Sequence, residues 1–185
     1  MQIVTADKIA YVSKKYVNIT HDIGSVLDVK ISDTNVYSLV QQVFEMGAKS
    51  WLCKMLNGSL TSPFGYRKHP ITGKYSFHSG IDIGANGGTP IYSPVDGFAQ
   101  TVAYDANGYG NYLIIIATDG TYHYFAHMKS TAIPKAGDMI HAGMKIGYVG
   151  TTGSSTGNHL HYEIRNLSKT AFDPNTYTYI KTLNK

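Results

Sequence analysis

From about residue 80 onward, hydrophobic residues recur in short runs that are separated by glycine, asparagine and aspartate. Short runs rich in β-branched and aromatic side chains, bounded by turn residues, are typical of β-strands. The chain therefore alternates between predicted strands and predicted turns over most of its length. The pattern predicts strands at 80–84, 90–92, 97–104, 111–118, 121–128, 139–141, 145–149 and 159–165.

Two features indicate how these strands are arranged. Asp119-Gly120 stands between two β-rich runs, and this dipeptide is a strong signal for a tight antiparallel hairpin. Residues 113–116 are all apolar, so both faces of that strand should be covered and the strand should lie centrally. The sequence therefore predicts a mainly β fold, either an antiparallel sheet or a small sandwich.

The pattern is different between Ser32 and Leu56, where apolar residues recur at three- and four-residue intervals. This spacing is typical of an amphipathic helix, which Gly47 can interrupt. A turn signal follows at 57–59. We predict an N-terminal appendage with this helix at 1–57 and a β domain at 58–185. The helix has two interpretations: it docks on a partner protein or neighbouring domain, or it packs on the sheet of its own domain.

Composition and charge narrow the classes of function. The 185 residues are 43% hydrophobic, and 16 basic against 12 acidic residues give a net charge of +4. The basic residues form no run and there is no glycine-rich phosphate loop, so we expect no nucleic-acid partner. The first twenty residues contain no apolar run long enough for a signal peptide or a membrane helix, so we expect no membrane insertion. Cys53 is the single cysteine, which excludes an intrachain disulfide.

The candidate chemistry lies in histidines. His159, His161 and Glu163 share one face of the predicted strand 159–165, because side chains alternate along a strand. Positions two apart lie roughly 6–7 Å from each other. That distance suits one metal ligand with a catalytic group beside it.

His78 and Asp82 are a second pair. A straight strand would place them about 13 Å apart, so the chain must bend between them, and Gly80 can supply that bend. His78, Asp82 and His161 would then form a nitrogen, oxygen, nitrogen set. Three protein ligands with an open fourth position are typical of a catalytic zinc site.

A third segment, 122–128, carries His123 and His127. Strand alternation places the two on the same face but about 13 Å apart. We therefore expect His127, near the end of the strand, to join the site and His123 to take no part in it.

These residues resemble the lysostaphin-type or LytM-type zinc endopeptidases that cut bacterial peptidoglycan. The family pattern of His-x-x-x-Asp is met by His78 to Asp82, and its His-x-His by His159 to His161. A further histidine in a Tyr-x-x-His context is met by His127. The resemblance covers roughly residues 60–165. It includes the segments 62–73, 88–91, 108–111 and 137–138.

The resemblance implies that His78, Asp82 and His161 bind one Zn²⁺ ion and that His127 and His159 assist catalysis. It implies hydrolysis of stem peptides or cross-bridges in peptidoglycan, at either glycine-rich bridges or D-amino-acid cross-links. Which of His127 and His159 is the general base stays open. A catalytically silent wall-binding or structural module of the same fold is the alternative, and such a module would lack at least one of these five residues.

The implied partner is bacterial peptidoglycan, and the implied location is the cell wall, reached outside the cell or as part of a phage particle or lysis system. Two other features have open interpretations. Arg67 could pair with a substrate carboxylate through its planar guanidinium, or make a structural hydrogen bond. Residues 150–157 could form a wall of the substrate groove, or a plain polar connection.

Overall fold

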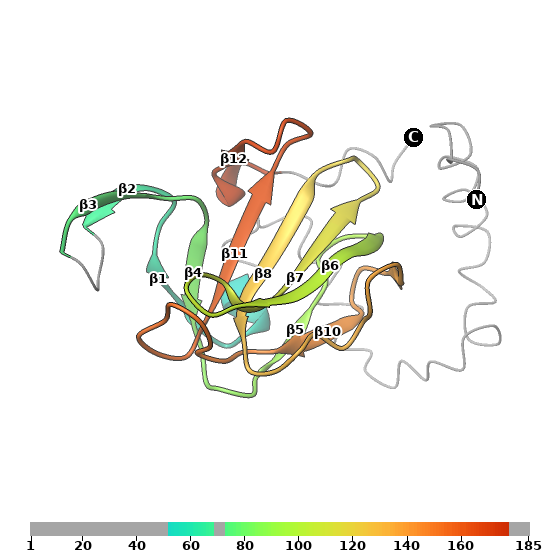
Figure 1. Ribbon diagram of the computed structural model, residues 1–185, viewed down its shortest axis with the longest axis horizontal. Helices are drawn as coiled ribbons and strands as arrows, with labels where there is room; N and C mark the ends of the chain where they lie inside the picture. Colours follow the sequence, from blue (N-terminus) through green and yellow to red (C-terminus); the bar gives the residue numbers. More distant parts are fainter. Residues whose placement is uncertain (1–51, 69–72, 178–185) are drawn as a thin grey trace. The chain divides into compact units, whose positions relative to one another are not determined.

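The computed structural model describes residues 52–68 and 73–177, all within one compact unit (Figure 1). Its main sheet has the strand order β1-β4-β11-β8-β7-β6-β9, with β12 pairing to β11. Every pairing in this sheet is antiparallel. The strands of the main sheet are β1 (Ser59–Ser62), β4 (Ile81–Gly84), β6 (Gly97–Asp105), β7 (Gly110–Ala117), β8 (Tyr122–Met128), β9 (Met139–Ile140), β11 (His159–Arg165) and β12 (Ala171–Phe172).

Two smaller antiparallel sheets accompany the main one in the described part of the chain. β2 (Gly65–Lys68) pairs with β3 (Tyr75–His78), and β5 (Pro90–Tyr92) pairs with β10 (Lys145–Tyr148). A short 3-10 helix, η1 (Pro174–Thr176), follows β12. The strands from β4 to β11 begin and end within one residue of their predicted limits, which confirms the mainly β, antiparallel fold.

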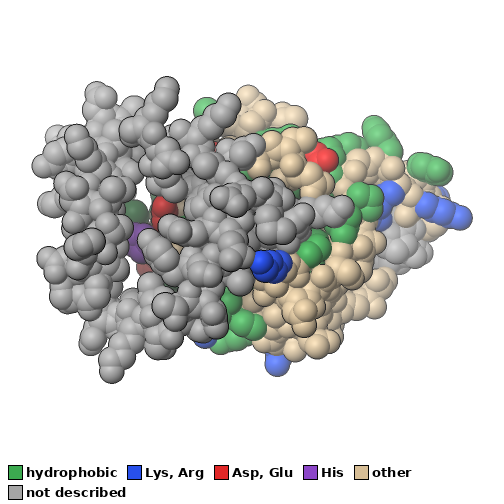
Figure 2. Space-filling model, turned by 180° about the vertical axis from the view of Figure 1, so that it is seen from behind, with side chains coloured by type: hydrophobic (Ala, Val, Ile, Leu, Met, Phe, Trp, Pro, Cys, Tyr) green, Lys and Arg blue, Asp and Glu red, His purple; other side chains and the backbone are tan. Residues whose placement is uncertain are grey.

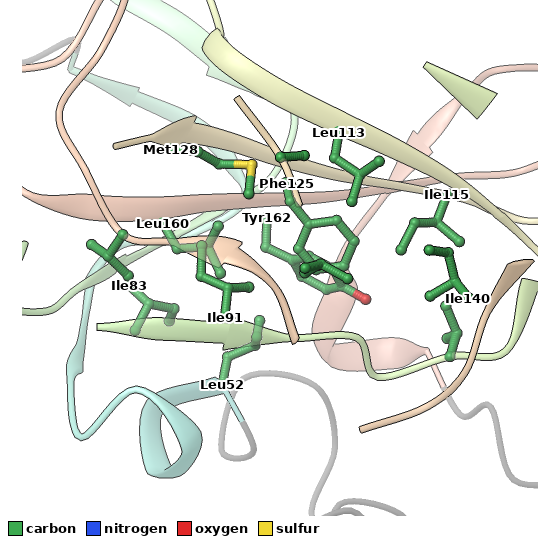
Figure 3. Close-up of a cluster of buried hydrophobic side chains, with 14 of the residues drawn as sticks. Leu52, Ile83, Ile91, Leu113, Ile115, Phe125, Met128, Ile140, Leu160 and Tyr162 are labelled. Atoms are coloured by element: carbon green, nitrogen blue, oxygen red, sulfur yellow. The ribbon is translucent and has the colours of Figure 1, made fainter. Parts of the chain in front are cut away.

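The core lies on one face of the main sheet (Figure 3). β7 lies between β6 and β8, and Leu113 and Ile115 on it are fully buried, so the prediction of a central covered strand is confirmed. Phe125 of β8 and Tyr162 of β11 pack with ring centroids 5.2 Å apart. Ile91 of β5 joins the same cluster and ties the smaller sheet to the main one.

Residues 52–55 are helical, and the rest of the predicted helix at 32–56 lies outside the described residues. Leu52 and Leu56 are buried in the same core cluster as Ile83 and Leu160. The end of this segment therefore packs on its own domain. The division at residue 58 and the role of residues 1–51 stay predictions.

The β2–β3 hairpin was not predicted, because its strands are short and one of its faces is exposed. Figure 1 shows the hairpin extending away from the main sheet. Tyr66 lies opposite Phe77, and Arg67 lies opposite Ser76. Since directly paired residues share a face and neighbours alternate, Tyr66 and Phe77 lie on one face and Arg67 on the other. Tyr66 is 80% exposed, whereas Arg67 is only partly exposed.

In the view of Figure 2, the Lys and Arg side chains of the described residues occur at separate positions among neutral surface. Within residues 52–68 and 73–177, no helix is long and apolar enough to span a membrane.

Candidate metal centre and catalytic cleft

A change of sheet brings His78 and Asp82 together. β3 ends at His78 in the small β2–β3 sheet, and β4 starts at Ile81 in the main sheet. As a result His78 Nε2 lies 3.2 Å from Asp82 Oδ1, not the about 13 Å of a straight strand. Gly80 lies in this bend because a Cβ there would come within 2.4 Å of the Tyr162 carbonyl oxygen.

His161 adds the third donor atom. β11 pairs with β4 so that His161 lies directly opposite Asp82. Its Nδ1 is 2.8 Å from Asp82 Oδ1 and 3.1 Å from His78 Nε2. In a tetrahedral site with bonds near 2.0–2.2 Å, neighbouring donors are roughly 3.3 Å apart. The three atoms thus form a triangle of the size that one zinc ion needs, and their types suit zinc.

The far side of each imidazole in this set also has a partner. Nδ1 of His78 donates a hydrogen bond to the Pro63 carbonyl oxygen at 2.8 Å. Nε2 of His161 lies 3.4 Å from Glu163 Oε2. Such partners orient a ligand imidazole and keep its lone pair on the nitrogen that faces the metal. Both rings are therefore oriented for ligation through the atoms that converge on Asp82.

The protonation states of the set follow from burial and contacts. Burial raises the pKa of Asp82, but hydrogen bonds from His161 and His78 outweigh it and hold that pKa well below its ordinary value. Burial lowers the pKa of His161, but its contacts with Asp82 and Glu163 raise it to about 8. Asp82 is therefore ionised at neutral pH, as a metal ligand must be.

His127 enters the cleft through an unusual backbone conformation. Ala126 pairs with His161, so alternation would place His127 on the core face with His123 and Phe125. Its φ of 57°, in the left-handed region, breaks the alternation. The ring of His127 consequently lies 5.9 Å from that of His161.

The prediction that His123 and His127 share a face was therefore wrong. His123 is fully buried on the other side of the sheet. Its Nδ1 lies 2.6 Å from the Tyr162 hydroxyl and its Nε2 lies 2.8 Å from Thr121 Oγ1. The left-handed residue His127 is the physical reason for the difference. His123 lies outside the cleft, as expected.

His159 lies beside His127, with ring centroids 4.6 Å apart. Its Nε2 is 3.7 Å from Asp82 Oδ1, so the ring lies next to the three converging donor atoms of His78, Asp82 and His161. Each of the two histidines donates from Nδ1 to a backbone carbonyl at 2.8 Å, His127 to Thr152 and His159 to Gly157. Because Nδ1 keeps its proton in these bonds, Nε2 of a neutral ring is an acceptor in both residues.

One loop, residues 150–158, thus supplies the carbonyl partners of both histidines. The loop is held against residues 108–111: Ser154 N donates to the Gly108 carbonyl at 2.9 Å, and Asn111 N donates to Thr152 Oγ1 at 2.9 Å. Gly153 has a φ of 72°, and a Cβ there would lie 2.2 Å from Gly110 N. The loop lines the cleft, so it is more than a plain polar connection.

Glu163 is the residue that sequence reasoning left without a role. It is fully buried, and its Oε2 accepts hydrogen bonds from Ser79 Oγ at 3.0 Å and the Tyr109 hydroxyl at 2.8 Å. Arg165 Nε forms an ion pair with its Oε1. Burial raises the pKa of Glu163, but contacts with His161 and Arg165 lower it below the ordinary value. The available signal was its position on the same strand face as His159 and His161.

The five predicted site residues line one cleft of about 530 Å³. Its walls come from the β2–β4 region, the segment before β7 and the loop 150–158. Burial lowers the pKa of His127 to about 4, although its hydrogen bond to Thr152 opposes the shift. The cleft therefore combines three converging donor residues, His78, Asp82 and His161, with a neutral His127 and with His159 beside it. This combination can activate water and move protons.

Such a site on an antiparallel sheet is of the metallopeptidase class. The sequence profile of peptidase family M23 matches residues 76–174, more than half of the chain. The chain belongs to this family.

Individual proteins agree with this assignment. DD-carboxypeptidase/endopeptidase Mpg of Neisseria meningitidis is 43% identical over 106 residues, which are 57% of this chain and 24% of that protein. The match thus spans about a quarter of that relative. The fold resembles the catalytic domain of the antimicrobial peptidase lysostaphin from Staphylococcus simulans, with a TM-score of 0.59 and 31% identity, over 69% of this chain and 95% of that chain. It also resembles a zinc containing peptidase from Vibrio cholerae, with a TM-score of 0.58 and 33% identity, over 64% and 36% of the two chains.

Proposed function

We propose that this chain is a zinc-dependent endopeptidase that hydrolyses peptide bonds in the stem peptides or cross-bridges of bacterial peptidoglycan. The observation that carries the proposal is the convergence of His78 Nε2, Asp82 Oδ1 and His161 Nδ1 beside two further histidines in one cleft. Membership of a zinc-dependent peptidase family supports it. The peptidoglycan substrate is inferred from relatives such as the peptidoglycan DD-endopeptidase ShyB of Vibrio cholerae, which is 36% identical over 107 residues.

His78, Asp82 and His161 would hold the ion. A bound zinc ion supplies Lewis acidity, which polarises the scissile carbonyl and lowers the pKa of a water towards neutrality. Asp82 contributes the negative charge of the set, and Pro63 and Glu163 orient the two imidazoles. The remaining chemistry, which is proton transfer, belongs to His127 and His159.

His127 suits the role of general base. Its Nδ1 is committed to Thr152, and its lowered pKa keeps Nε2 free to accept a proton at neutral pH. His159 lies beside His127, and its Nε2 is 3.7 Å from Asp82 Oδ1. From this position His159 can pass a proton to the leaving amine or assist the developing oxyanion.

The second candidate is a catalytically silent wall-binding or structural module. Such a module would dispense with at least one ligand or proton-transfer group. All five lie in one cleft here, which favours the enzyme. We infer action at the cell wall, from outside the cell or within a phage particle or lysis system. Docking of a protein partner on residues 1–57 remains a separate prediction.

Digestion of purified peptidoglycan tests the proposal. Walls with direct cross-links and walls with glycine bridges are incubated with the zinc-loaded chain, with and without a chelator, and new amino groups are counted. We expect chelator-sensitive release from one wall type. We expect His127→Ala and His159→Ala to retain bound zinc but to lose about 10²- to 10⁴-fold in rate, as removal of a proton-transfer group does.

His78→Ala should instead lose the zinc itself, measured as metal per folded chain. No release from either wall by a folded chain that holds zinc would favour the silent module.

A further inference from the structure

The strongest unassigned group in the cleft is the guanidinium of Arg67. Strand alternation in the β2–β3 hairpin places Arg67 on the face opposite the exposed Tyr66 and Phe77, and Arg67 lines the cleft. One of its terminal nitrogens lies 3.7 Å from Asp82 Oδ2. This distance is that of an ion pair without a hydrogen bond, because charge-assisted N–H···O bonds are about 2.7–2.9 Å long.

A second observation is independent of this contact. Arg67 Nε is enclosed by the protein, yet it has no hydrogen-bond partner among the described residues. Buried donors of this kind are rare, since leaving one unpaired costs about 1–3 kcal/mol. Because Nε is enclosed, a ligand in the cleft can reach only the two terminal nitrogens, which form a planar fork that can bind both oxygens of a carboxylate.

The charged residues of the cleft leave Arg67 as the group suited to binding an anion. Arg67 is the one Lys or Arg among the described residues that line it, while Asp82 and Asp105 are the carboxylates. Asp82 offers Oδ1 to the metal set, and Oδ2 of the same group lies beside Arg67. An anion bound by Arg67 would therefore lie on the Oδ2 side of Asp82, while the proposed metal ion would lie on the Oδ1 side of the same carboxylate.

We propose that Arg67 recognises a free carboxylate on the substrate residue next to the scissile bond. The inference rests on the proposed peptidase function and narrows its substrate class. A direct cross-link made through a diamino acid can carry a carboxylate on the carbon that bears the cross-linking amine. An internal glycine bridge has none. The geometry thus favours directly cross-linked or carboxy-terminal peptides over glycine bridges.

Two peptides that differ at a single group test the inference. Both contain the same scissile bond, and the residue on the leaving-amine side ends in a carboxylate in one and a carboxamide in the other. We expect the zinc-loaded chain to prefer the carboxylate by about 10- to 100-fold in kcat/KM, the range of a charge-assisted pair. Calorimetric titration should show the same order of affinity.

Variants separate recognition from a merely structural role. In Arg67→Gln the preference should collapse to near 1, and in Arg67→Lys it should fall in part, because an ammonium cannot bind both oxygens in a plane. Lys68→Gln is the matched control, since it removes one positive charge from the opposite face of the same strand. It should keep the wild-type ratio. Zinc content is measured for each variant.

Each outcome decides a different point. If Arg67→Gln slows both peptides equally and keeps the preference, Arg67 only positions Asp82 and the inference is overturned. Equal hydrolysis or equal affinity of the two peptides with the wild-type chain also overturns it, while leaving the peptidase function intact. If neither peptide is cut, the proposed function fails, and the titration still decides whether the cleft selects a carboxylate.

Discussion

Glu163 Oε2 lies 3.4 Å from His161 Nε2, on the edge of the ring away from the Nδ1 atom that faces Asp82. The carboxylate is fully buried and also accepts hydrogen bonds from Ser79 and Tyr109. A buried carboxylate behind a ligand imidazole orients the ring and strengthens the donor. The orientation of His161 is therefore supported by a buried carboxylate that does not itself line the cleft.

Glu163→Gln removes this charge while keeping the size of the side chain. We expect zinc affinity to fall about 10- to 100-fold, as when other partners of ligand histidines are replaced. Competition with a chromogenic chelator measures the affinity. Tyr109→Phe is a useful comparison because it removes one donor to Glu163 and leaves the carboxylate, so its loss should be smaller. Unchanged zinc affinity in Glu163→Gln would show that His161 needs no support from this side.

Gly153→Ala should damage the loop whose carbonyl oxygens hold the rings of His127 and His159. At this position φ is 72° and a Cβ would lie 2.2 Å from Gly110 N, so the loop must shift. The Thr152 carbonyl would then move from His127 Nδ1, and we expect kcat to fall at least about 10-fold with zinc retained. Gly157→Ala is the control, since a Cβ there meets no atom within 4 Å. Equal activity of the two variants would contradict the role assigned to the loop.

His123 should make stability depend on pH. Burial lowers its pKa to about 4, from 6.5 in the unfolded chain, so the fold favours the neutral ring. The free energy of unfolding therefore keeps its full value with respect to this group above pH 6.5. As the pH falls from 6.5 through 4, that free energy drops by up to about 3 kcal/mol, because the unfolded chain binds a proton that the buried ring does not. Urea unfolding of the metal-free protein between pH 7 and pH 4.5 should show a steeper loss for wild type than for His123→Gln. Parallel pH profiles would assign the acid sensitivity to other groups.

The segment before β1 is testable through Leu52. Its side chain is fully buried in the core, so Leu52→Ala should lower the free energy of unfolding by about 2–5 kcal/mol. Leu167→Ala makes the same chemical change at a side chain that is 74% exposed, and it should change stability by less than about 0.5 kcal/mol. A small effect at Leu52 would revive the interpretation of this segment as a docking helix.

The strand pattern was predictable because burial on a sheet imposes a local period of two residues. The apolar run 113–116 indicated a covered central strand, and Asp119-Gly120 indicated the hairpin that joins β7 to β8. The hairpin β2–β3 was missed because its strands are short and one of its faces is exposed. A strand of four residues with alternating exposure carries too weak a signal to stand out from a loop.

The sequence by itself determined the set of candidate site residues, because the spacing of His78 to Asp82 and of His159 to His161 is local information. Tertiary structure alone decided how they meet. The left-handed backbone at His127 turns its ring into the cleft, against the alternation of its strand. The partners of the imidazoles, the carbonyls of Thr152 and Gly157 and the carboxylate of Glu163, are joined by folding, with sequence separations from 2 to 25. Glu163 at least shares the strand period with His161, but the Thr152 carbonyl is 25 residues from His127 and leaves no periodic pattern, so only the fold reveals that partner.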